Sequence, residues 1–296
     1  MKLKKAIAVV IAAVTVFMFC SCETINDFFE NDLKVESGLD EGNLISYYID
    51  VGQGDSEFII FPDGKTMLID AGTREGGEQV IKLINKLGCK KIDFLIATHP
   101  HSDHIGGLAD VIKEFDVDKI YMPKAVTQTK TYEYLLQTIQ NKNKKIKTAK
   151  AGMNITNSDE FDYSADILSP VSDSYEDLNN YSVVVMIRFK NKKFLYMGDA
   201  EKQVENELLE NKTDVNADVV KVGHHGSRTA STAKFLKAVG AKYAVFSLGK
   251  DNDYGHPHKQ AIARWEKTGA EMYRTDQKGT ITISTDGDSI KVETEK

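Results

Sequence analysis

The sequence predicts a single α/β domain in which two β-sheets are flanked by helices. Short apolar runs rich in strand-forming residues alternate with helical patterns across residues 44–296, and about 250 residues suit one large domain. Histidine and aspartate residues directly follow several of the predicted strands. Because layered α/β folds carry their chemistry at the carboxyl ends of strands, this placement supports the same fold class.

The first half of the domain alternates regularly between strands and helices. A pattern of apolar residues at helical spacing ends at Gly88, a typical residue just beyond a helix. The next apolar run is rich in strand formers, and Gly106 with Gly107 allows a close turn after it. The expected elements are strands at 44–51, 57–61 and 91–98, and helices at 80–87, 108–115 and 132–139.

The second half continues this alternation. Its expected elements are strands at 194–197, 218–222 and 243–248, and helices at 201–209 and 259–267. A histidine or an aspartate stands shortly after each of the three strands. The sequence therefore predicts that these polar side chains meet at one edge of a sheet.

Residues 98–107 read Thr-His-Pro-His-Ser-Asp-His-Ile-Gly-Gly and contain three of the seven histidines in the chain. His99, His101 and His104 would repel one another if charged, and each would need a partner if buried. A divalent cation satisfies all three together with Asp103, because zinc binds imidazole nitrogens and carboxylate oxygens at about 2.0–2.2 Å. The motif predicts half of a two-ion site.

Three later strand ends offer further candidates. Asp199 can bridge two cations, although an aspartate at this position can instead cap the following helix. Adjacent side chains on an extended chain point to opposite sides, so we expect one ligand from His224 and His225 and favour His225, with His224 supporting it or facing substrate. His256 is a candidate either to protonate a leaving group or to bind a phosphate oxygen.

Taken together, these segments resemble the metallo-β-lactamase superfamily, whose signature is the His-x-His-x-Asp-His motif after a strand. Further segments are similar to the C-terminal hydrolase domain of ComEC-type competence proteins: Asp50–Ser56, Leu68–Gly72, Asn179–Ser182, Met197–Ala200, Val222–Ser227 and Tyr254–Pro257. The resemblance runs from about Leu44 to the end of the chain. It implies a four-layer αββα sandwich with metal-dependent hydrolase activity.

The resemblance also implies two divalent ions, with zinc as the expected metal. It places Asp199 between the ions and divides the other ligands into two groups: His99 and His101 for one ion, and Asp103, His104 and His225 for the other. Two such ions activate a water and stabilise both oxygens of a phosphoryl displacement, so the expected reaction is hydrolysis. Asp103 is also a candidate to accept the proton of that water.

One segment departs from the wider superfamily. Many members have a further histidine where this chain reads Asn179-Asn180, and asparagine is a poor zinc ligand. The ion near His99 and His101 is therefore expected to be weakly held, or to be a harder cation such as manganese. Asn179 or Asn180 is a candidate to orient substrate by hydrogen bonds, and the alternative is that both are simple turn residues.

The remaining candidates support the site or contact substrate. Asp55 and Ser56 lie in a glycine-containing turn that borders the metal cleft in the related family, so they are expected to contact substrate unless the turn is a plain hairpin. Asp70 is expected to hydrogen-bond the metal-site loops. Ser227 stands at an expected helix start, where free backbone N–H groups can hold an anion and where serine can also act as a cap.

The N-terminus predicts export. Met1 to Lys5 is basic, Ala6 to Phe19 is apolar but short for a membrane span, and Cys22 follows a small residue. This pattern resembles a bacterial lipoprotein leader at 1–21, with Cys22 as the lipidated first residue, a flexible acidic tether at 22–43 and a hydrolase domain at 44–296. A secreted product and an uncleaved membrane anchor are the alternatives.

Charge limits the function classes. The net charge of −6 gives no bulk attraction to nucleic acid, although lysines between residues 142 and 150 form a local basic cluster. We expect an extracytoplasmic, membrane-anchored phosphodiesterase that acts on DNA. The alternatives are hydrolysis of small or cell-wall phosphodiesters, such as phosphocholine or teichoic-acid groups, and a non-catalytic, metal-stabilised binding module. No protein partner is predicted.

Overall fold

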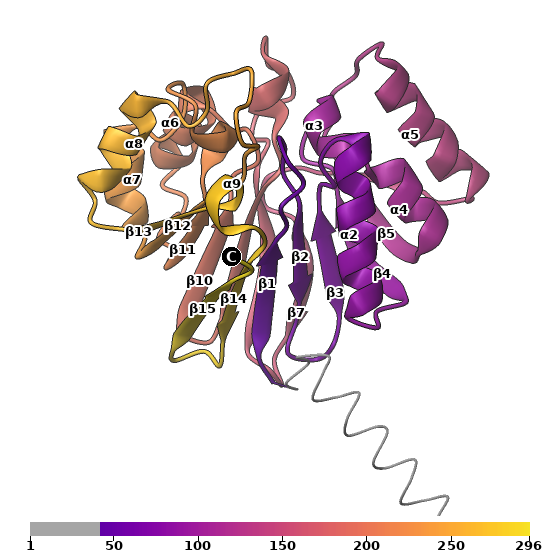
Figure 1. Cartoon of the computed structure of the whole chain (residues 1–296), viewed down its shortest axis with the longest axis horizontal. Helices are drawn as coiled ribbons and strands as arrows, with labels where there is room; N and C mark the ends of the chain where they lie inside the picture. The colour runs from indigo at the N-terminus through magenta and orange to yellow at the C-terminus, as the bar shows by residue number, and fades with distance from the viewer. Residues whose placement is uncertain (1–41) are drawn as a thin grey trace, which may run out of the picture. The chain divides into compact units, whose positions relative to one another are not determined.

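The computed structural model describes residues 42–296, which contain two β-sheets and the helices that cover them (Figure 1). The predicted leader at 1–21, Cys22 and the predicted tether as far as residue 41 lie outside the described residues. The expected α/β class with two sheets and flanking helices is confirmed. None of the helices in residues 42–296 is long and apolar enough to cross a membrane.

The first sheet combines antiparallel and parallel pairing. Its eight strands lie in the order β15 (Ile290–Thr294), β14 (Ile281–Thr285), β1 (Leu44–Tyr48), β2 (Glu57–Ile60), β3 (Thr66–Ile69), β4 (Lys91–Ile96), β5 (Asp116–Met122) and β6 (Ile146–Thr148). The strands from β15 to β3 pair antiparallel, and those from β3 to β6 pair parallel. The histidine motif begins just after β4, which belongs to the parallel half of this sheet.

The second sheet also changes from antiparallel to parallel pairing. Its seven strands lie in the order β13 (Glu271–Arg274), β12 (Tyr243–Phe246), β11 (Val219–Lys221), β10 (Lys192–Tyr196), β9 (Val184–Phe189), β8 (Tyr163–Ser169) and β7 (Asn154–Ser158). β10, β11 and β12 are parallel neighbours. Their carboxyl ends therefore lie at one edge of the sheet, and the segments that follow them carry Asp199, His225 and His256.

Helices cover the outer faces of both sheets (Figure 1). The helices beside the first sheet are α2 (Arg74–Lys86), α3 (Ser102–Ile105), α4 (Leu108–Glu114) and α5 (Lys130–Asn141); those beside the second are α6 (Lys202–Glu210), α7 (Ala233–Val239) and α8 (Lys259–Glu266). α2 begins at the Thr73 cap, whose side chain accepts a hydrogen bond from the Gly76 N–H. It ends just before Gly88, which has the expected positive φ of 73°.

Two apolar layers of the core meet at the second sheet. Phe94 of the first sheet and Phe194 of the second belong to the cluster between the sheets, whereas Leu195, Phe235 and Trp265 belong to the cluster under the outer helices. Consecutive residues of β10 therefore point into different apolar layers. A strand that is buried on both faces has a continuous run of apolar residues, which is why apolar and polar residues do not alternate at Phe194–Tyr196.

Candidate metal centre

The loop after β4 places the histidine motif at the edge of the first sheet. His101 precedes α3 in extended conformation, so the chain turns into the helix at once. Nε2 of His99 lies 3.0 Å from Nδ1 of His101, and Nε2 of His99 lies 3.8 Å from a carboxylate oxygen of Asp199. These three residues form one compact group of nitrogen and oxygen donors.

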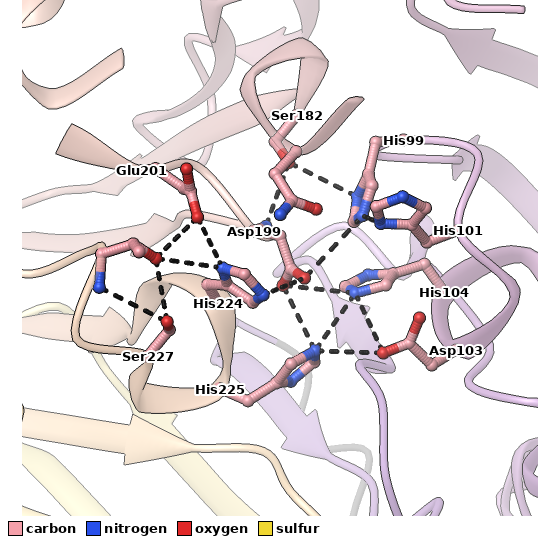
Figure 2. Close-up of polar contacts among 12 residues, drawn as sticks. His99, His101, Asp103, His104, Ser182, Asp199, Glu201, His224, His225 and Ser227 are labelled. Carbon is pink, nitrogen blue, oxygen red and sulfur yellow. Dashed lines mark hydrogen bonds and ion pairs between the residues drawn. The ribbon is translucent and has the colours of Figure 1, made fainter. Parts of the chain in front are cut away.

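A second group of donors uses the other carboxylate oxygen of Asp199 (Figure 2). Oδ1 of Asp199 lies 3.2 Å from Nε2 of His104 and 3.3 Å from Nε2 of His225. Asp103 completes the group, with Oδ2 3.4 Å from Nε2 of His225. One donor atom from each of the four residues lies within 4.8 Å of the others. Asp199 is thus common to both groups, as expected for a bridging carboxylate.

Neighbouring polar groups set the orientation of the imidazole rings. Nδ1 of His104 donates to Asp70 at 2.7 Å, and Nδ1 of His225 donates to the backbone carbonyl of Ser247 at 2.8 Å. With each Nδ1 holding its proton, the lone pair of each Nε2 faces the cluster, as a metal ligand requires. Asp70 also accepts the Thr98 N–H at 2.8 Å, so it ties the histidine loop to β3 as predicted.

The segment that carries His224 and His225 is a left-handed turn, so the extended geometry assumed from the sequence is wrong. His224 has φ 48° and His225 has φ 52° within η2 (Gly223–Gly226). The planes of the two rings are inclined at 72° to each other. His225 is buried in the cluster, whereas Nδ1 of His224 donates to Glu201 at 3.0 Å and its Nε2 lies 3.6 Å from Asp199.

The electrostatics of the cluster favour a cation. Burial opposes ionisation of Asp199, but His225 and His104 hold the pKa of its carboxyl well below the usual range. Burial likewise opposes charge on His104, yet the carboxylates of Asp199 and Asp103 raise its pKa well above the ordinary value. The buried carboxylates therefore demand positive charge, which either protons or a metal can supply.

The donor set fits a divalent metal. Oδ1 of Asp199 is buried and has no hydrogen-bond partner within residues 42–296, although buried polar atoms are almost always partnered. A carboxylate oxygen aimed at two imidazole nitrogens is a typical zinc environment. His99 and His101 would hold one ion and Asp103, His104 and His225 the other, with Asp199 shared; their role as ligands stays a prediction.

A cleft of about 410 Å³ opens onto the cluster. Its walls come from both sheets: Gln53, Pro100, His101, Ser102, Asp103, Thr129, Asn179, Asp199, His224, His225, Tyr254 and His256. Nδ1 of His256 and Oδ1 of Asn179 are buried there without a partner in the described part of the chain. The cleft therefore offers unused polar groups to a bound molecule.

Several residues predicted to contact substrate lie elsewhere. Asp55 and Ser56 are only 1% and 0% exposed and do not line the cleft. Asp55 instead forms an ion pair with Lys221, and the Ser56 hydroxyl donates to the Asp70 carbonyl at 3.0 Å. Asp55 and Ser56 lie beneath the cluster, although Gln53 of the same turn lines the cleft, so the expectation that Asp55 and Ser56 contact substrate is wrong.

The two adjacent asparagines have different positions in the structure. Oδ1 of Asn180 accepts a hydrogen bond from the Glu201 N–H at 3.3 Å, which ties it to the start of α6. Asn179 is the asparagine that lines the cleft. A short helical turn, η1 (Leu178–Tyr181), sets these directions. The sequence named both residues but gave no means of choosing between them, because their directions depend on that turn.

The predicted anion site near Ser227 is not formed. α7 begins at Ala233 with Thr232 as its cap, and the Ser227 hydroxyl lies 2.8 Å from that of Thr229. The carboxylate of Glu205 accepts the backbone N–H of Thr232 at 2.8 Å and that of Ser231 as well. A buried glutamate therefore occupies the place expected for an anion.

Sequence reasoning missed three charged residues around the site. Glu201 binds His224, Glu57 lies buried near Asp55, and Lys221 is wholly buried within β11. Burial and the neighbouring Asp55 raise the pKa of Glu57 well above its usual range. The one available signal was a lysine within the otherwise apolar run Val219 to Val222, because buried lysines need a partner.

The fold and the donor cluster define a class: α/β proteins with two packed sheets and a histidine–aspartate centre at the strand ends, generally metal-dependent hydrolases. The chain belongs to the metallo-beta-lactamase superfamily, whose family model matches residues 49–250. Members of this fold family bind two divalent metal ions. The superfamily and the four-layer fold expected from the motifs are thereby confirmed.

Curated relatives include competence proteins. The chain is 32% identical over 250 residues to ComE operon protein 3 of Bacillus subtilis, covering 79% of this chain and 32% of that protein. It is 25% identical over 249 residues to Recombination protein 2 of Haemophilus influenzae, covering 83% of this chain and 29% of that protein. The resemblance to ComEC-type proteins is confirmed, and the chain spans about a third of the length of these relatives.

A solved structure supports the fold. CmlA, a diiron beta-hydroxylase from Streptomyces venezuelae, superposes with a TM-score of 0.53 at 14% identity, covering 81% of this chain and 53% of that chain. At this low identity the likeness concerns the fold alone.

Proposed function

We propose that this protein is a metal-dependent phosphodiesterase that hydrolyses DNA outside the cytoplasm. The observation that carries the proposal is the position of Asp199, which belongs to both donor groups at the base of one cleft. When bound there, two divalent ions would supply activation of a water and stabilisation of charge on the attacking and leaving oxygens. The relationship to competence proteins favours DNA as the substrate.

Asp103 is the proposed proton acceptor. Its side chain is 21% exposed, compared with 3% for Asp199, and it lines the cleft. Burial alone would raise the pKa of Asp103, but His104 and His225 lower it, so the residue is an ionised carboxylate at neutral pH. An ionised carboxylate facing the cleft is positioned to take a proton from the attacking water.

His256 is proposed to bind a phosphate oxygen. Burial and the nearby His225 and His224 lower the pKa of His256 to about 4, which leaves it neutral at pH 7. A neutral imidazole is a poor general acid but a good hydrogen-bond donor. Of the two roles predicted from the sequence, the contact with a phosphate oxygen therefore has the better support.

Two further residues of the cleft suit a nucleotide. Oε1 of Gln53 accepts the Gly249 N–H at 3.1 Å, which directs its Nε2, unpartnered within residues 42–296, as a donor. Tyr254 is 62% exposed, and its ring stacks on that of His256 with centroids 5.7 Å apart. An exposed aromatic ring beside a phosphate-binding group is a typical platform for an unpaired base.

The test uses the full chain with single- and double-stranded DNA, and with zinc and manganese supplied separately. Asp103→Ala is the control, because it removes the proposed proton acceptor. Cleavage by the wild-type protein that is lost in this variant would establish the nuclease. If metal is bound and DNA stays intact, DNA is the wrong substrate.

A small or cell-wall phosphodiester is the second candidate substrate. The acidic net charge of −6 repels polyanions, and a cleft of about 410 Å³ has the size of a small-ligand site. Bis(p-nitrophenyl) phosphate and p-nitrophenylphosphorylcholine, assayed beside DNA, separate the two substrate classes. Absence of any hydrolysis with two ions bound would identify the third alternative, a non-catalytic, metal-stabilised module.

Cys22 is proposed to carry a lipid that anchors the protein outside the cytoplasm. The basic start, the apolar stretch and the cysteine after a small residue support this site. Incorporation of a labelled fatty acid in bacterial cells tests it, with Cys22→Ala as the control. Label that persists in the variant, or an unlabelled wild-type protein found in the medium, would favour one of the other N-terminal fates.

A further inference from the structure

Lys221 is a buried cation directly beneath the metal centre. It lies within β11 of the second sheet and is 0% exposed. Its Nζ lies 2.6 Å from Oδ2 of Asp55 and donates to the Val222 carbonyl at 2.8 Å. Both charges of this ion pair are removed from water, since Asp55 is 1% exposed.

Asp55 belongs to the opposite half of the molecule. It lies between β1 and β2 of the first sheet, and its N–H donates to the Asp103 carbonyl at 3.2 Å. Its carboxylate approaches imidazoles from both sheets: Oδ1 lies 3.1 Å from Nδ1 of His225 and Oδ2 lies 3.9 Å from Nδ1 of His104. The ion pair with Lys221 therefore crosses from one sheet to the other immediately behind the donor cluster.

The residues of the donor cluster are likewise divided between the two sheets. Asp103 and His104 follow β4 of the first sheet, whereas Asp199 and His225 follow β10 and β11 of the second. One ion held by all four residues requires a fixed spacing between the sheets at this edge. Apolar packing alone is non-directional and tolerates small shifts, but an ion pair with two defined contacts does not.

Stability alone does not account for a lysine at this position. Moving two charges out of water is unfavourable, and well-packed apolar replacements of buried ion pairs are often neutral or stabilising. The contacts of Asp55 with His225 and with the Asp103 backbone give the pair a different use. It can hold the two halves of the donor cluster in register.

We propose that the Lys221–Asp55 ion pair is a cross-sheet clamp that positions His225 against Asp103 and His104 for metal binding. Both residues are positioning residues, which touch neither substrate nor the cleft. The inference rests on the metal site of the proposed function and is independent of the identity of the substrate. Groups that orient metal ligands from behind typically change metal affinity by tenfold to a hundredfold when removed.

The test measures zinc affinity and ion stoichiometry of the full chain by calorimetry and native mass spectrometry, together with the visible spectrum of the cobalt-loaded protein. The variants are Lys221→Met, Asp55→Asn and the double variant, which leaves no uncompensated charge. Tyr196→Phe is the matched control, because Tyr196 donates a buried hydrogen bond of 2.9 Å across the sheets to Ser46 without touching the donor cluster. His225→Ala removes a predicted metal ligand and so shows how far zinc binding falls when a ligand is lost.

We expect the double variant to fold with nearly wild-type stability, to bind zinc about tenfold to a hundredfold more weakly, and to show an altered cobalt spectrum. The Tyr196→Phe protein should keep wild-type zinc affinity. A folded double variant with wild-type affinity and spectrum would overturn the clamp. If the double variant does not fold, Asp55→Asn decides in the same way, because it is isosteric and removes the carboxylate charge that pairs with Lys221.

The outcomes separate this inference from the proposed function. Wild-type protein that binds no divalent metal overturns both. Zinc binding that is lost in His225→Ala but unchanged in the clamp variants leaves the metal site in place and overturns the clamp alone.

Discussion

Nδ1 of His104 donates a hydrogen bond of 2.7 Å to the carboxylate of Asp70, and both side chains are completely buried. This contact fixes the ring so that Nε2 points at Asp199. It joins β3, which ends just before Asp70, to the helix that carries the predicted ligand. An orienting contact of this kind has measurable consequences for metal binding.

Replacing Asp70 by asparagine should weaken zinc binding by about tenfold to a hundredfold. Residue 70 has φ 53°, which asparagine tolerates, so the backbone is undisturbed. Zinc titration by calorimetry measures the effect. Asp63→Asn is the matched control, because Asp63 bonds Lys65 and Tyr163 away from the cluster. Equal affinities in the two variants would contradict an orienting role for Asp70.

Replacing Asp199 by asparagine should remove both ions rather than one. Asp199 is the residue shared by the two donor groups, and an amide is a poor replacement for a bridging carboxylate. Native mass spectrometry of zinc-loaded protein gives the stoichiometry. His101→Ala, which touches only one group, should leave one ion. Retention of one ion in Asp199→Asn would show that the carboxylate does not bridge.

The metal-free protein should lose stability as the pH rises from 7 to 9. Burial opposes charge on His104 and His225, but neighbouring carboxylates, Asp199 foremost, raise the pKa of both well above the ordinary value. A raised pKa in the folded state gives stability that is complete below about pH 6.5 and is lost as the pH rises through the folded-state value. The loss is at most about 1.4 kcal/mol per pH unit for each imidazole.

Urea unfolding in the presence of a chelator at pH 7, 8 and 9 measures this slope. Zinc affinity should increase over the same range, because bound metal replaces those protons. The His225→Gln protein lacks one of the two imidazoles with a raised pKa, so its slope should be smaller. A stability that is constant with pH in both proteins would be inconsistent with protonated imidazoles in the metal-free cluster.

Replacing His256 by alanine should lower kcat/KM for bis(p-nitrophenyl) phosphate by about a hundredfold while leaving both ions bound. The basis is the loss of one hydrogen-bond donor to a charged oxygen, which costs about 2.7–4 kcal/mol in comparable sites. His256→Gln should recover part of the activity, since its amide also donates. If the His256→Ala protein lost a metal ion, His256 would be a metal ligand and not a group that binds substrate.

Replacing Glu205 by alanine should destabilise the fold by about 3 kcal/mol. The carboxylate is 1% exposed and accepts the buried N–H groups that precede α7, which would be left without partners. For a domain of this size the melting temperature should fall by about 6–12 °C. Glu210→Ala, at the exposed end of α6, should change it little. Similar decreases in melting temperature for both variants would show that the buried carboxylate of Glu205 contributes no more to stability than the exposed one of Glu210.

Local patterns predicted the elements that carry the site. The runs before His99, Asp199 and His224 are strands, and helices follow near the predicted positions, because apolar periodicity and glycine stops act within a few residues. The predicted metal-binding side chains of the motif from His99 to His104 are neighbours in the sequence. Their closeness in space could therefore be predicted without knowing how distant segments pack.

Long-range packing decided the rest. Asp55 lies beneath the cluster instead of in the cleft because the turn after β1 folds toward Lys221 of the opposite sheet. The positive φ at His224 and His225 sends one ring to Glu201 and the other into the cluster, which an assumption of extended chain geometry misses. The choice between Asn179 and Asn180 likewise depends on a single helical turn.

The sequence by itself determined the superfamily, the order of the elements and the residue types able to bind metal, since these follow from local spacing and composition. Only the tertiary structure decided which side chains face the cleft, which support the ligands from behind, and how Lys221 and Asp55 link the two sheets. Those outcomes depend on side-chain direction and on distances between segments far apart in the chain, which spacing along the sequence does not encode.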